Sequence, residues 1–73
     1  MPTINFAIRG EHIQLDQLLK ATGLVSSGGI AHVEIAKGAV KVDGEVELRK
    51  RAKLRFGQHV AYEDTVIVLE ATP

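Results

Sequence analysis

The chain has 73 residues, of which 45% are apolar and 25% charged, with no cysteine and only three histidines. These values fit one small globular domain spanning residues 1–73. They exclude a second domain, a disordered chain, a disulfide scaffold and a cysteine-based zinc or haem site. The formal net charge is zero, yet residues 37–55 hold seven Lys and Arg against three Asp and Glu, a local charge of +4. Such a concentration is typical of proteins with anionic partners.

The first half of the chain predicts one strand and one helix. Residues 3–8 alternate apolar and polar side chains, which is the period of a half-buried strand. Apolar residues then recur at helical spacing in Leu15, Leu18 and Leu19. Gly23 can take the left-handed conformation that closes a helix, so we expect this helix to end there.

A second helix is predicted from Ser26 or Ser27 to Lys37. The serine hydroxyls can cap its first turn, and the glycine that follows Lys37 can end it. Ala31 and Ile35, four residues apart, should form its inner face. Two helices so close in the chain form a helix-turn-helix unit, which is compatible with many functions.

Residues 40–48 predict a β-hairpin that turns at Asp43-Gly44. With a two-residue loop, Glu45 and Glu47 would lie on the apolar face beside Val42 and Val40. The alternation of apolar and polar residues therefore favours a three-residue loop, 42–44, with Gly44 in the left-handed region. The predicted cross-strand pairs are Val40 with Val46 and Lys41 with Glu45. Two further short strands are expected at 59–62 and 66–70, joined by a turn at Glu63-Asp64.

The strongest functional signal is a run of five cations within residues 49–55. In an extended chain, Ala52 and Leu54 would pack inward and the odd-numbered cations would form a row beside Lys41, suited to phosphates. These odd-numbered cations are Arg49, Arg51, Lys53 and Arg55. The competing interpretation is a solvated basic loop balanced by nearby acids; the clustering favours the anion-binding one.

Residues 26–29, Ser-Ser-Gly-Gly, could cradle a phosphate, because glycines allow close backbone approach at a helix N-terminus. The spacing of a nucleotide P-loop is absent, so that motif is excluded, and a simple helix cap is favoured over an anion contact. No nucleophile has an evident base, and we expect no enzyme, no metal and no cofactor. The chain shows no membrane span or signal peptide, which makes the cytoplasm the expected compartment.

Taken together, these motifs resemble the S4 RNA-binding domain, and in particular the short stand-alone bacterial S4-like proteins. The resemblance covers about residues 13–70. It rests on IQLDQLLK (13–20), GLVSSGGIA (23–31), GAVKVDGE (38–45) and ELRKRAKL (47–54), followed by Gly57.

The resemblance implies an α+β fold with the αL motif, in which two short helices pack on a small, mainly antiparallel sheet. It implies a non-enzymatic protein that binds structured RNA, ribosomal RNA in particular, along the second helix and the adjoining hairpin. A protein-interaction module that uses the same basic strip against an acidic partner is the alternative. The RNA-binding residues that we predict are Ser27, Gly28, His32, Lys37, Lys41, Arg49, Lys50, Arg51, Lys53 and Arg55.

Two features of the chain refine this expectation. Glu34 stands where the family commonly has an apolar residue, which leaves open whether it faces solvent or alters the helix. The only aromatic residues are Phe6, Phe56 and Tyr62, too few to form a platform for several stacked bases. We therefore expect recognition of RNA by shape and phosphate, with a preference for helical over single-stranded RNA.

Overall fold

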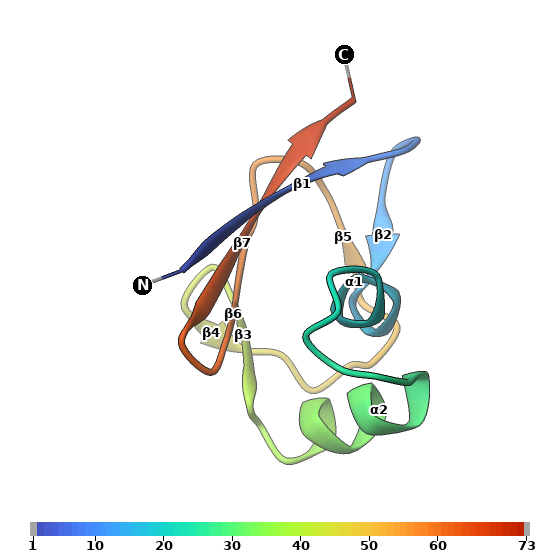
Figure 1. Cartoon of the computed structure of the whole chain (residues 1–73), viewed down its shortest axis with the longest axis vertical. Coiled ribbons are helices and arrows are strands. Elements are labelled where there is room, and N and C mark those ends of the chain that lie inside the picture. Colours follow the sequence, from blue (N-terminus) through green and yellow to red (C-terminus); the bar gives the residue numbers. More distant parts are fainter. Residues whose placement is uncertain (1, 73) are drawn as a thin grey trace.

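The protein is described by a computed structural model that covers residues 2–72; residues 1 and 73, the ends of the predicted domain, lie outside the described part. Two helices lie beside one another on one side of a twisted sheet, as Figure 1 shows. The elements are β1 (Thr3–Ile8), β2 (Ile13–Gln14), α1 (Leu15–Ala21), α2 (Gly28–Ala36), β3 (Val40–Val42), β4 (Glu45–Val46), β5 (Lys53–Leu54), β6 (His59–Tyr62) and β7 (Thr65–Ala71).

The strands form two sheets. The larger has the order β1-β7-β6-β3-β4, in which only the β1–β7 pair is parallel, and the smaller is the antiparallel pair β2-β5. The prediction of an α+β fold with two short helices on a mainly antiparallel sheet is therefore confirmed.

The core lies between the helices and the larger sheet. Apolar residues recur at the predicted spacings, and the side chains that are almost completely buried come from both helices and from most strands. The largest of them are Ile8, Leu15, Leu18, Leu19, Ile35, Val40, Leu54, Val60, Ile67 and Leu69. The inner face of α2, Ala31 and Ile35, is buried as predicted.

The predicted register of the hairpin is wrong. Lys41 pairs with Val46 and Val42 with Glu45, so the loop has two residues, Asp43 and Gly44. Both have positive φ, 51° and 86°, which is the type I′ turn that matches the twist of a hairpin. The expected left-handed conformation of Gly44 is confirmed.

The register differs from the prediction because the apolar residues after the turn do not face the core: Val46 and Leu48 are 50% and 60% exposed. The short edge strand β4 instead places Glu47 opposite Val40, whose carbonyl accepts the Glu47 N–H at 3.0 Å. An ion pair described below accommodates the Glu47 carboxylate at this position.

Candidate nucleic-acid interface

The basic segment, residues 49–53, connects the two sheets. Ala52 is buried, whereas the four cations of the segment are exposed. The Ala52 N–H donates to the Arg49 carbonyl at 3.1 Å, which closes a turn over Lys50 and Arg51. The prediction of a continuous extended row is therefore wrong, because the chain must turn here to leave β4 and pair as β5 with β2. The expected inward packing of Ala52 and Leu54 is confirmed.

The turn nevertheless brings three of the predicted cations together. Arg49, Arg51 and Lys53 line one surface hollow of about 440 Å³, with Ala52 as its apolar part. Lys41 and Arg55 are not among the residues that line it. Lys41 is exposed on β3, and the Arg55 guanidinium reaches the Glu11 carbonyl in the loop before β2, at 3.5 Å.

Two main-chain hydrogen bonds attach the basic segment to α1. The first N–H groups of a helix have no partner within the helix, and the N-cap residue Gln14 makes no side-chain cap. The Leu15 N–H instead donates to the Ala52 carbonyl and the Asp16 N–H to the Lys50 carbonyl, both at 3.0 Å. The position of the cations is thereby tied to the start of α1, beside which the segment passes in Figure 1.

Asp16 also joins α1 to α2. Its Oδ2 atom accepts a hydrogen bond from His32 Nε2 at 2.8 Å, and the two side chains are 13% and 36% exposed. Asp16 therefore contacts the basic segment through its backbone and α2 through its carboxylate. The hydrogen bond holds the partly exposed His32 side chain against α1.

The start of α2 has the predicted cap. Ser27 Oγ accepts the Ile30 N–H at 3.2 Å, which satisfies one N–H of the first turn. A Cβ atom added at Gly28 would meet no atom within 4 Å, so packing within the chain does not require a glycine there. The surface at this end of α2 can be approached closely.

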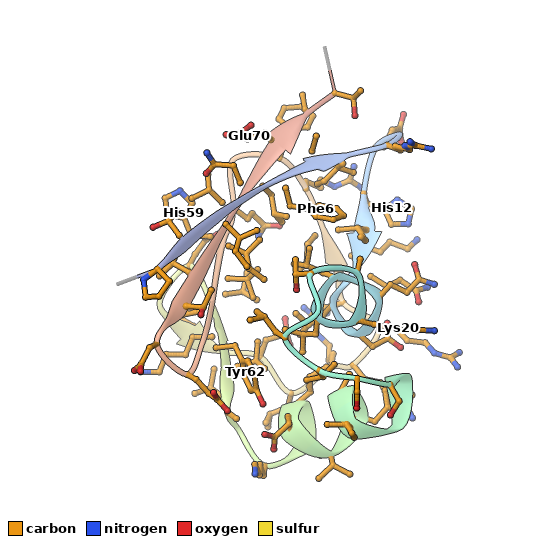
Figure 2. All side chains as sticks on the ribbon, in the orientation of Figure 1. Phe6, His12, Lys20, His59, Tyr62 and Glu70 are labelled. Atoms are coloured by element: carbon orange, nitrogen blue, oxygen red, sulfur yellow. The ribbon has the colours of Figure 1, made fainter. Side chains whose placement is uncertain are left out.

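The other end of α2 is anchored by Glu34. Its carboxylate accepts the Tyr62 hydroxyl at 2.6 Å and pairs with Lys37 at 2.5 Å; Tyr62 reaches from β6 toward α2 in Figure 2. The hydrogen bonds from Lys37 and Tyr62 lower the pKa of Glu34, and the contact with Glu34 raises the pKa of Tyr62. Glu34 thus makes polar contacts at a position where the family commonly has an apolar residue, and α2 stays a regular helix there.

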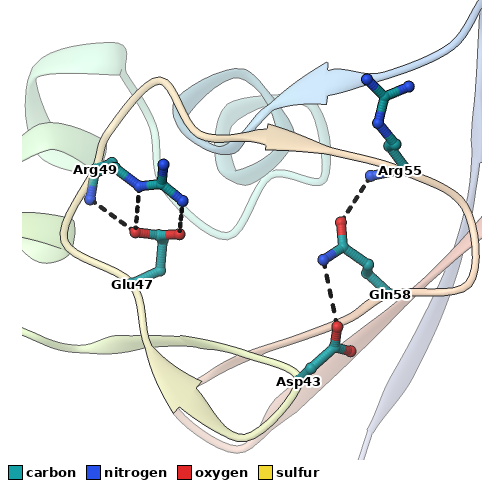
Figure 3. Close-up of polar contacts among 5 residues, drawn as sticks. All are labelled: Asp43, Glu47, Arg49, Arg55 and Gln58. Carbon is teal, nitrogen blue, oxygen red and sulfur yellow. Dashed lines mark hydrogen bonds and ion pairs between the residues drawn. The ribbon is translucent and has the colours of Figure 1, made fainter.

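Glu47 contacts Arg49, one of the residues that line the hollow, through both side chain and backbone (Figure 3). The carboxylate accepts from Arg49 Nε at 3.1 Å, from Nη2 at 3.0 Å and from the Arg49 backbone N–H at 3.2 Å. This pairing lowers the pKa of Glu47 and raises that of Arg49.

Sequence reasoning missed the organising roles of Asp16 and Glu47. No local pattern connects Asp16 with His32, sixteen residues away. Glu47 could have been found, because residues i and i+2 of an extended chain lie on the same side.

Among residues 2–72, no helix is long and apolar enough to cross a membrane. Within the same residues, no group of three or more His, Asp or Glu side chains is placed to hold a metal ion.

Comparison with known proteins identifies a family, similar proteins and a similar solved structure. The model of the S4 domain family matches residues 6–70. The YbcJ proteins of Escherichia coli (strain K12) and Shigella flexneri are each 51% identical over 51 residues, which are 70% of this chain and 73% of theirs. The solution structure of E. coli YbcJ, described as revealing an αL motif involved in RNA binding, matches with a TM-score of 0.69 and 41% identity. It aligns over 97% of this chain and 89% of that one.

Proposed function

The chain belongs to the S4 domain family, and from this premise we propose that it binds structured RNA, ribosomal RNA in particular, in the cytoplasm and without a catalytic step. The proposed contacts come from α2 with its cap and from the cations around the basic segment. They are Ser27, Gly28, His32, Lys37, Lys41, Arg49, Lys50, Arg51, Lys53 and Arg55.

One observation carries the proposal: the basic segment and α2 are fixed to the same helix. Asp16 donates its backbone N–H to the Lys50 carbonyl and accepts a hydrogen bond from His32. Because these bonds hold the backbone that carries the cations before binding, less backbone entropy is lost when the cations meet phosphates. A rigid arrangement of charges also favours a partner of fixed shape, such as an RNA helix, over a flexible strand.

The aromatic residues support recognition by shape and phosphate. Tyr62 is buried and its hydroxyl is bonded to Glu34, and Phe6 is half-buried on β1. Phe56 is 58% exposed and directly follows Arg55, so its ring is the one aromatic side chain placed to meet a base. A single exposed ring cannot stack several successive bases.

The alternative of an acidic protein partner is not favoured, because the solved structure of E. coli YbcJ is described as having a motif involved in RNA binding. Direct binding separates the two functions. Purified protein should bind folded fragments of ribosomal RNA, and tagged protein should sediment with ribosomal subunits. Sequencing of crosslinked RNA would then locate the contact. Failure to bind any folded RNA at low salt would overturn the proposal.

A further inference from the structure

The Glu47–Arg49 pair differs from an ordinary surface ion pair in its geometry. The two residues are two positions apart, and the carboxylate is bonded to both the backbone and the guanidinium of Arg49. The side chain of Glu47 is 18% exposed and that of Arg49 is 80% exposed. The carboxylate therefore lies behind the guanidinium, and an anion that arrives from solvent meets Arg49 first.

The pairing leaves one edge of the guanidinium available. Arginine has five N–H donors in a planar fork. Glu47 takes the Nε–Nη2 side, and Nη1 lies outside the ion pair. Donors on Nη1 and the remaining hydrogen on Nη2 form an edge that fits two oxygens of one phosphate.

We propose that the hollow lined by Arg49, Arg51 and Lys53 binds one backbone phosphate of RNA, and that Glu47 is the positioning residue that orients Arg49 toward it. This inference rests on the proposed function. Arg51 and Lys53 supply the net positive charge of the hollow, because Glu47 compensates the charge of Arg49. Arg49 supplies a directed pair of hydrogen bonds, whose geometry Glu47 fixes before binding.

A different role for Glu47 predicts the opposite effect. If Glu47 only neutralised Arg49, it would compete with phosphate, and its removal would strengthen RNA binding as the loss of any nearby acid does. Glu45 provides the matched control: it is exposed, lies two residues earlier, and takes part in none of the ion pairs found among residues 2–72.

The experiment measures the affinity for a folded RNA hairpin by fluorescence anisotropy. We expect Glu47→Gln to weaken binding by about three- to tenfold, a loss of about 0.7 to 1.4 kcal/mol, and Glu45→Gln to leave it unchanged or stronger. In an Arg49→Ala background, Glu47→Gln should cause no further loss, because its effect passes through Arg49. Glu47→Asp, which keeps the charge but shortens the side chain, should also weaken binding and replaces the glutamine variant if that variant does not fold.

Two results with these variants would overturn the inference. One is an equal effect of Glu47→Gln and Glu45→Gln on a wild-type protein that binds RNA; the other is an undiminished effect of Glu47→Gln without Arg49. A wild-type protein that does not bind the hairpin would overturn the proposed function instead. Titration with inorganic phosphate gives a second readout: the NMR signal of Arg49 Nε–Hε should shift, and phosphate and the hairpin should compete for the hollow. Phosphate that stays bound beside the RNA would also contradict the inference.

Discussion

Asp16 and His32 form the side-chain hydrogen bond that joins α1 to α2, at 2.8 Å across sixteen positions of the chain. The backbone of Asp16 is bonded to Lys50 at the same time. One residue therefore couples the two regions that are proposed to contact RNA.

The coupling between Asp16 and His32 can be measured by a double-mutant cycle. Asp16→Ala should lower the free energy of unfolding by about 1 kcal/mol, because it removes a partly buried hydrogen bond. In a His32→Ala background, the same substitution should cost about 0.5 kcal/mol less. Urea denaturation gives the four stabilities. A coupling energy of zero would show that the bond does not stabilise the helix pair.

The basic segment should carry a large part of the affinity for RNA. The triple variant Arg49→Ala, Lys50→Ala and Arg51→Ala should bind folded RNA more weakly and keep its circular dichroism spectrum, since all three side chains are exposed. The log–log salt slope of wild-type binding should be roughly −3 to −5, and the variant should lower its magnitude by about 2.

A single substitution provides the control for this experiment. Arg9→Ala removes one cation from a separate hollow that Arg9 lines with Phe6 and His12, and it should weaken binding less than Arg51→Ala. Equal affinities of the triple variant and the wild type at low salt would contradict the proposed interface.

Gly28 should matter for binding and not for folding. Its first-turn position has open space around it, so Gly28→Ala should keep or raise the stability, by up to about 1 kcal/mol. If RNA approaches the start of α2 closely, the added methyl group should weaken binding. Gly29→Ala, which alters the next, exposed position, is the matched control. Identical affinities of the two variants would remove Gly28 from the interface.

The Glu34–Tyr62 contact predicts how stability depends on pH. The pKa of Glu34 is lowered in the folded protein, so its contribution is present above its ordinary value of 4.5 and is lost as pH falls through the lowered value. The pKa of Tyr62 is raised, so its contribution is present below 10 and is lost as the unfolded tyrosine ionises above that pH. Thermal unfolding should show Tm falling at both extremes, and Tyr62→Phe should reduce the fall at alkaline pH. If the Tm of Tyr62→Phe falls at alkaline pH as much as that of the wild type, groups other than Tyr62 cause the fall.

The type I′ turn predicts the cost of a substitution at Gly44. Its φ of 86° is poorly tolerated by a β-branched residue, so Gly44→Val should lower the free energy of unfolding by more than about 1 kcal/mol. Gly44→Asn should cost less, because asparagine enters this region more readily. Equal Tm values for Gly44→Val and wild type would contradict the turn assignment.

Both helices and most strands were predicted because each is specified locally, whereas the short pair β2–β5 was not predicted. The helical spacing of Leu15, Leu18 and Leu19 and the glycine at 23 are signals within a few residues of the structure they specify. The hairpin register was mispredicted because it depends on which face of β4 is covered, and that is a property of the whole sheet. The Asp43-Gly44 turn signal was correct, and it determines the register against the alternation of the apolar residues.

The candidate site was only partly predictable. The cations were visible as a cluster, but their convergence on one hollow depends on a turn that follows from the pairing of β5 with β2. The contacts of Asp16 with Lys50 and His32 join segments far apart in the chain, and no local pattern encodes them.

The proposed interface for folded RNA combines the basic segment with the start of α2. It is tested by mapping the amide NMR shifts of the labelled protein on addition of an RNA hairpin, beside a single-stranded oligomer of equal length. We expect shifts concentrated in residues 27–32 and 49–53 with the hairpin, and much weaker shifts with the single strand. Shifts centred on Arg9 and His12, or tighter binding of the single strand, would contradict it.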